Sequence, residues 1–136
     1  MFFLYNLFVA FAGFVLEIVA VFSPKMKLFV HGRRTVFATL EQKIGREDQT
    51  IWFHAASLGE YEQGLPVIEK VKAQYPKHKI VLSFFSPSGY EVRKNNTVAD
   101  VTVYLPLDSA QNAKRFLDLI HPELVFFIKY EYWPNY

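Results

Sequence analysis

A glutamate that could act as a base closes the run Trp52–Glu60, which reads Trp-Phe-His-Ala-Ala-Ser-Leu-Gly-Glu. A carboxylate held beside a hydroxyl group can take its proton as a new bond forms. Glu60 also stands three residues after Ser57, which is the spacing of a helix capping box. Small residues such as Gly59 let the backbone approach a ligand closely. Glu60 is therefore either a helix cap alone or a general base, and the capping geometry excludes neither.

A second carboxylate, Glu131, follows an apolar segment and stands two residues after Lys129. Apolar runs alternate with stretches of helical spacing along the chain, which predicts an α/β fold with a parallel sheet covered by helices on both faces. The predicted strands are 50–54, 79–84, 100–105 and 124–128; the predicted helices are 58–74, a short one reaching about 94, and one capped by Asp108 or Ser109 that reaches 120. In the strand order 3-2-1-4, the loops after strands one and four meet where such sheets bind ligands. We therefore expect Glu60 and Glu131 to face one crevice.

Composition excludes several classes of protein. The net charge is +2, so no nucleic acid or other polyanion is expected as a partner. The chain has no cysteine, and its four histidines lack the spacing of metal ligands, so neither a disulfide nor a metal site is expected. No complete P-loop, G-x-G-x-x-G or G-x-S-x-G motif is present. We interpret His54 as a strand-end histidine held by backbone groups.

The amino terminus, 1–22, is an apolar run interrupted at Asn6, Gly13 and Glu17. About 20 such residues can span a bilayer as a helix. No Lys or Arg precedes the run and several follow it, which disfavours a cleaved signal peptide and predicts a cytoplasmic position for the rest of the chain. Because Glu17 is costly inside a membrane, the expected anchor is either a spanning helix or a deeply inserted helix that lies in the interface.

A polar and basic segment, 23–49, follows the apolar run. Its spacing predicts a connector with an amphipathic helix interrupted at Gly32. Arg33 and Arg34 stand at the expected membrane border. They fit a patch facing lipid headgroups, and they also fit recognition of a phosphate on a lipid substrate, because the guanidinium group matches phosphate geometry.

Four motifs of this chain resemble those of one family, in the same order and at compatible spacing. The run Trp52–Glu60 is similar to the family signature W-x-H-x-x-S-x-G-E, and Glu131–Asn135 is similar to its E-x-W-P-N motif. Between them, Ser86–Gly89 resembles a T/S-P-T/S-G turn, and Leu105–Asp108 resembles the exit of the third strand. The family is that of the 3-deoxy-D-manno-octulosonic acid (Kdo) transferases of lipopolysaccharide synthesis, and the resemblance extends to the last residue.

The resemblance implies a GT-B glycosyltransferase, in which two Rossmann-like domains face each other across a cleft. The family acts at the cytoplasmic face of the bacterial inner membrane and moves Kdo from CMP-Kdo to a hydroxyl of the lipid A precursor, without a metal or other cofactor. The resemblance implies Glu60 as the general base and Glu131 as a residue that stabilises the transition state. With the residue patterns, it predicts an acceptor-binding set: Ser57, Gly59, Arg33, Arg34, Ser86, Ser88, Gly89 and Lys129. Many relatives carry an acid at the position of Lys129, so the local charge differs here.

The expected organisation is a membrane-anchoring helix at 1–22, a basic connector at 23–49, and a truncated acceptor-binding Rossmann-like domain at 50–136. The carboxyl-terminal donor domain and the rest of the sheet are expected to be missing, so we expect no transferase activity from these 136 residues alone. The alternative function is a membrane-tethered Rossmann-like module that binds an anionic lipid without catalysis.

Overall fold

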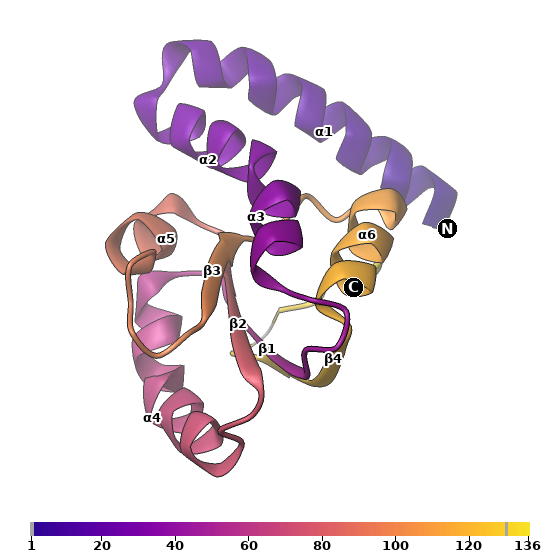
Figure 1. Ribbon diagram of the computed structural model, residues 1–136. Helices are drawn as coiled ribbons and strands as arrows, with labels where there is room; N and C mark the ends of the chain where they lie inside the picture. Colours follow the sequence, from indigo (N-terminus) through magenta and orange to yellow (C-terminus); the bar gives the residue numbers. More distant parts are fainter. Residues whose placement is uncertain (1, 130) are drawn as a thin grey trace.

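The computed structural model describes residues 2–129 and 131–136, and its centre is a sheet of four parallel strands (Figure 1). The strands are β1 (Thr50–Ala55), β2 (Lys79–Phe84), β3 (Val101–Tyr104) and β4 (Pro122–Phe127). Their order is β3-β2-β1-β4, which is the order assumed above for a doubly wound sheet. The carboxyl ends of β1 and β4 therefore lie side by side, at the point where the order of the strands reverses.

Helices cover both faces of the sheet, as predicted. One face carries α4 (Leu58–Gln74), and the other carries α3 (Val36–Lys43) and α6 (Ala110–Ile120). The short helix α5 (Pro87–Arg93) follows β2. Every residue of β1 is buried, and its side chains alternate between the two faces, so that Trp52 packs with α3 and α6 while Phe53 packs with α4. A strand covered on both faces needs this nearly continuous apolar sequence.

β4 differs from the prediction in its bounds and in its exposure. It begins at Pro122, two residues before the expected start, and the register with β1 shifts between Thr50 and Ile51. Pro122 has no N–H to donate to a ladder, which is consistent with an irregular strand start. Leu124 and Val125 are 40% and 42% exposed, because β4 is an edge strand in the described part of the chain.

The segment before β1 contains three helices, and the predicted break at Gly32 is wrong. These are α1 (Phe2–Phe22), α2 (Pro24–Arg34) and α3, and the break between the last two falls at Thr35. Gly32 lies inside α2, where the Tyr104 ring packs so closely that a Cβ atom would meet it at 2.2 Å. Gly32 therefore permits a close helix contact and does not interrupt the helix.

The helix α3 belongs to the core of the sheet domain. Leu40 is fully buried and Val36 is 2% exposed, in one cluster with Trp52. The expected boundary at 49/50 therefore divides residues that share a single core. The helix α1 lies across one end of the domain, above α2, with its amino-terminal end near α6 (Figure 1).

Candidate active site

Two turns rich in small residues meet at the carboxyl end of the sheet. The Ser86 N–H after β2 donates to the carbonyl of Ala56 after β1, at 2.9 Å. Gly89 is buried against this contact, since a Cβ atom there would lie 3.2 Å from the backbone nitrogen of Leu58 and 2.3 Å from the Phe84 ring. The sequence thus provides glycine at a place where two backbones approach each other. These contacts join the run Trp52–Glu60 and the turn Ser86–Gly89 into one surface.

Glu60 caps α4, as the sequence predicted. Its carboxylate accepts a hydrogen bond from the backbone N–H of Ser57 at 3.0 Å, and the two residues form a capping box. The partly exposed Glu60 side chain is thereby held at the carboxyl end of β1. A partly exposed carboxylate in this position can serve as a cap and still receive a proton from a substrate hydroxyl.

Glu131 lies after β4 and is held by a different set of groups. The indole N–H of Trp133 donates to Glu131 Oε2 at 2.8 Å, and His54 Nε2 lies 3.5 Å from the same oxygen. The His54 imidazole lowers the pKa of Glu131 below its ordinary value, and the Trp133 hydrogen bond acts in the same direction against the opposing effect of burial. Glu131 is therefore an ionised carboxylate at neutral pH.

His54 is fully buried, and a side chain holds its ring in place, so the expectation that backbone groups hold it is wrong. Its Nδ1 lies 2.8 Å from Ser83 Oγ, and the same oxygen accepts the indole N–H of Trp52 at 2.8 Å. When the Ser83 hydroxyl donates to His54 Nδ1, the proton of a neutral ring lies on Nε2, and this nitrogen faces Glu131.

The two arginines of the expected phosphate site point in different directions. Arg33 turns inward, where its guanidinium donates to the carbonyls of Phe29 and Phe85, each at 2.7 Å. Burial lowers the pKa of Arg33 to about 10. Arg34 is exposed and pairs with Glu17 at 2.7 Å. Neighbouring residues of a helix point about 100° apart, and here Arg33 faces the core while Arg34 faces solvent.

A family model described as 3-deoxy-D-manno-octulosonic-acid transferase (kdotransferase) matches residues 31–136. The chain belongs to this Kdo transferase family. It is 36% identical over 89 residues to the 3-deoxy-D-manno-octulosonic acid transferase of Haemophilus influenzae, covering 64% of this chain and 21% of that protein. The corresponding protein of Aquifex aeolicus is 35% identical over 86 residues (62% and 24%), and that of Chlamydophila psittaci is 30% identical over 143 residues (98% and 32%).

The chain thus spans between about a fifth and a third of the length of these relatives. Its parallel sheet with helices on both faces is consistent with the amino-terminal domain of a GT-B glycosyltransferase. The matched region includes Glu60 and Glu131 and all the residues of the expected acceptor-binding set.

Three further residues of the predicted acceptor-binding set, Ser86, Ser88 and Lys129, follow β2 and β4. Ser86 Oγ and Ser88 Oγ lie 2.7 Å apart, and the exposed Lys129 adopts a left-handed backbone conformation with φ of 68°. The carbonyl of Lys129 accepts the N–H of Glu131 at 3.0 Å. Within residues 2–129 and 131–136, no group of three or more His, Asp and Glu side chains is placed to hold a metal ion.

Two polar residues of the family motifs have a structural role that the sequence reasoning missed. Asp108 is 2% exposed and accepts hydrogen bonds from the Tyr5 hydroxyl at 2.6 Å and from the Asn135 backbone N–H at 3.2 Å. The Asn135 amide also donates to the Asp108 carbonyl at 2.7 Å. Asp108 and Asn135 both belong to motifs shared with the family, which marks them as important. Their contact could not be read from the sequence, because the two residues are 27 positions apart along the chain.

Proposed function

We propose that this chain is the acceptor-side domain of a glycosyltransferase of lipopolysaccharide synthesis. The reaction is the transfer of Kdo from CMP-Kdo to a hydroxyl group of the lipid A precursor. The observation that carries the proposal is the family match over residues 31–136, which includes two carboxylates at the carboxyl ends of the adjacent strands β1 and β4. Open α/β sheets bind their substrates at this end.

Glu60 is the proposed general base. A sugar hydroxyl is a weak nucleophile at neutral pH, so removal of its proton as the new bond forms accelerates the reaction, typically by about 10²–10⁴-fold. In this reaction the acceptor oxygen bonds to the anomeric carbon of Kdo, and the bond from that carbon to the cytidylate oxygen breaks. The proton of the acceptor hydroxyl passes to Glu60. The hydrogen bond from the Ser57 N–H supports this role because it fixes the position of the carboxylate.

Glu131 is the proposed stabiliser of the transition state. Glycosyl transfer builds positive charge on the sugar ring, and a nearby carboxylate stabilises that charge. The lowered pKa of Glu131 keeps the group negative, and His54 and Trp133 keep it oriented.

We further propose that the protein attaches to the cytoplasmic face of the bacterial inner membrane through α1. One described helix, Phe2–Phe22, is long and apolar enough to cross a bilayer, with a mean hydropathy of 2.1. The acceptor is a lipid, so this attachment brings the site to its substrate. Arg34, which is exposed and pairs with Glu17, is the proposed partner of an acceptor phosphate, and Arg33 is proposed to hold α2 against the domain.

A transfer assay tests the proposal. The full-length enzyme is mixed with CMP-Kdo and the lipid A precursor, and the lipid product is analysed by mass spectrometry. We expect a mass increase by one or more Kdo units; a full-length enzyme that is folded and binds both substrates without forming this product would refute the proposal.

The capping role of Glu60 favours a second candidate, a membrane-tethered module that binds an anionic lipid without catalysis, because a cap alone needs no chemistry. Precursor binding without Kdo transfer in the same assay would establish that candidate.

A further inference from the structure

The helix α1 has one face packed on the domain along most of its length. The residues of this face recur at helical spacing and are partly or fully buried: Tyr5, Val9, Ala12, Leu16 and Ala20. The opposite face is apolar and exposed, and it includes Leu4, Phe11 and Phe22, which are 68%, 65% and 83% exposed. These three lie on one line of the helix, so α1 has a distinct inner and outer face.

Polar contacts tie the amino-terminal end of α1 to the domain. The Tyr5 hydroxyl donates to the buried Asp108 at 2.6 Å. Asn6 Oδ1 accepts hydrogen bonds from the backbone N–H of Ala110 at 2.9 Å and from the Asn135 amide at 3.2 Å. Tyr5 and Asn6 therefore have specific partners, which a helix end dissolved in lipid would leave unsatisfied.

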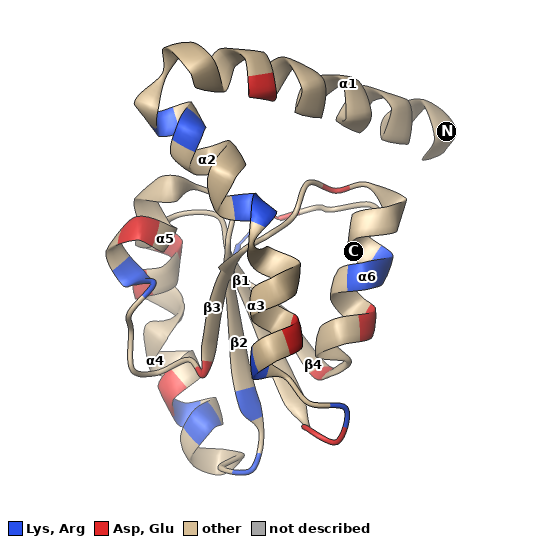
Figure 2. Cartoon of the chain, turned by 45° about the horizontal axis from the view of Figure 1, so that its top comes forward, with Lys and Arg blue, Asp and Glu red and all other residues tan. Residues whose placement is uncertain are grey.

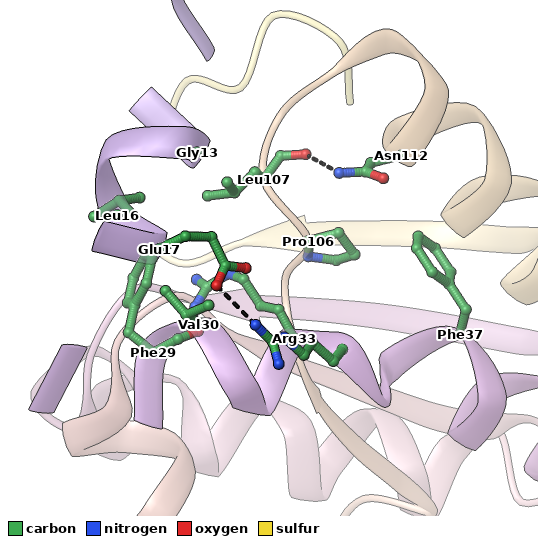
Figure 3. A pocket seen from close by; sticks show the side chains of 11 residues that line it. Gly13, Leu16, Glu17, Phe29, Val30, Arg33, Phe37, Pro106, Leu107 and Asn112 are labelled. Carbon is green, nitrogen blue, oxygen red and sulfur yellow. Dashed lines mark hydrogen bonds and ion pairs between the residues drawn. The ribbon is translucent and has the colours of Figure 1, made fainter. Parts of the chain in front are cut away.

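The carboxyl-terminal half of α1 is tied to the domain as well. Leu16 and Ala20 pack in one cluster with Phe29 and Val30 of α2. Glu17 pairs with Arg34 at 2.7 Å. A cavity of about 190 Å³ beside this pair is lined by α1 and α2 together with Phe37 and Leu107 (Figure 3). Near the middle of the helix, a Cβ atom on Gly13 would contact Leu107 at 3.3 Å.

We propose that α1 lies in the plane of one membrane leaflet, with its outer face in the lipid and its inner face on the domain. A helix of 21 residues is about 30 Å long, so a spanning α1 would carry Tyr5 and Asn6 away from Asp108 by most of the thickness of a bilayer. The contacts at both ends of α1 fit the in-plane arrangement. The inference rests on the proposed membrane attachment and specifies its geometry.

Charge complementarity identifies the partner as an anionic leaflet. The exposed side chains of Lys25 and Lys27 belong to α2, which packs against the carboxyl-terminal half of α1 and carries several Lys and Arg positions (blue in Figure 2). In-plane helices bury their apolar face about 5–10 Å into the headgroup and acyl boundary, where neighbouring basic groups meet anionic lipids.

The arrangement also determines where the active site lies. Leu107 and Asp108 follow the carboxyl end of β3, and Asn135 belongs to the same motif as Glu131, so α1 crosses the domain at the end of the sheet that carries the proposed site. An in-plane α1 therefore places this end at the level of the lipid headgroups, where the sugar of a lipid acceptor resides.

The depth of the outer face distinguishes an in-plane helix from a spanning one. The chain contains no cysteine, so nitroxide labels can be attached to single-cysteine variants Leu4→Cys, Phe11→Cys and Phe22→Cys. The labelled chains are bound to vesicles of phosphatidylethanolamine and phosphatidylglycerol, and label depth is measured by paramagnetic resonance. We expect three similar depths of about 5–10 Å below the headgroups. A label at Phe11 about 15 Å deep, with the other two near opposite surfaces, would establish a spanning helix and overturn the inference.

Cross-linking tests the inner face in the same vesicles. A cysteine pair at Gly13 and Leu107 is expected to form a disulfide or react with a short bis-thiol reagent, because the two positions are in contact. The matched control is a cysteine pair at Phe14 and Leu107. It is expected to remain uncross-linked within one chain, since Phe14 is exposed on the outer face.

The outcomes separate this inference from the proposed attachment. Cross-linking of the control pair between two chains would identify a second copy as the occupant of the outer face, which would overturn the inference. Failure of the chain to bind the vesicles would refute the proposed membrane attachment, and the inference with it.

Discussion

The substitution Glu60→Gln distinguishes the role of Glu60 as a helix cap from its role as a general base. The expected loss of stability is small, whereas the expected loss of turnover is large. The Ser57 N–H can still donate to the amide oxygen of glutamine, so the hydrogen bond of 3.0 Å is retained. What is lost for stability is a negative charge at the amino terminus of α4, which contributes about 0.5 kcal/mol. For a domain of this size the melting temperature should fall by roughly 2 °C.

The expected effect on catalysis is several times larger. A glutamine amide cannot take the proton of the acceptor hydroxyl, so turnover should fall by about 10²-fold or more, which corresponds to roughly 2.7 kcal/mol of activation free energy. Acceptor binding should remain within a few-fold of normal. The assay follows Kdo transfer by the full-length enzyme under saturating substrates, together with a thermal melt of the same sample.

The matched control is Glu62→Gln, which removes a charge from the same helix at an exposed residue that pairs with Arg93. We expect its turnover to be normal and its melting temperature to change by a similar small amount. A Glu60→Gln enzyme with near-normal turnover would refute the role of Glu60 as a base and leave it as a cap. Glu131 would then be the next carboxylate to test.

Two further predictions concern pH and packing. Because His54 lowers the pKa of Glu131 in the folded state, the stabilisation from this carboxylate is present above the ordinary pKa of glutamate and is lost as the pH falls through the lowered pKa. The difference in unfolding free energy between wild type and Glu131→Gln, from denaturant titrations, should be constant near neutral pH and shrink in acid; a constant difference at all pH values would contradict this. Gly32→Ala should destabilise the fold by about 1–3 kcal/mol, because the new Cβ would lie 2.2 Å from the buried Tyr104 ring. Gly59→Ala, whose Cβ has no neighbour within 4 Å, should instead raise stability by about 0.5 kcal/mol, and equal effects of the two changes would refute the packing argument.

Local sequence patterns predicted the elements of the fold well. The expected bounds of β2 and α4 agree with the structure, because each is a continuous run whose hydrophobic spacing matches one period and whose ends are marked by turn or capping residues. The parallel arrangement also followed from the sequence, since apolar strands separated by helices are typical of a parallel sheet covered on both faces. The exposure of β4 did not follow from its apolar sequence. The capping box at Ser57 and Glu60 is a contact between residues three positions apart, which sequence spacing specifies directly.

Contacts between distant segments were not predictable in this way. The sequence placed Arg33 and Arg34 together, but the packing of α2 on the Phe85 segment turned one inward and left the other in solvent. The role of His54 likewise depended on Ser83, which lies 29 residues further along the chain.

The amino-acid sequence by itself determined the four strands, the helices between them, the capping box of α4, and the family to which the motifs point. These properties depend on neighbours within a few positions, where backbone geometry fixes which side chains can meet. The tertiary structure decided that His54 faces Glu131, that Gly32 admits the Tyr104 ring, and that Tyr5 at the start of α1 reaches Asp108. Such contacts form only when the packing of the core sets the distance and orientation between elements, and no local period in the sequence carries that information.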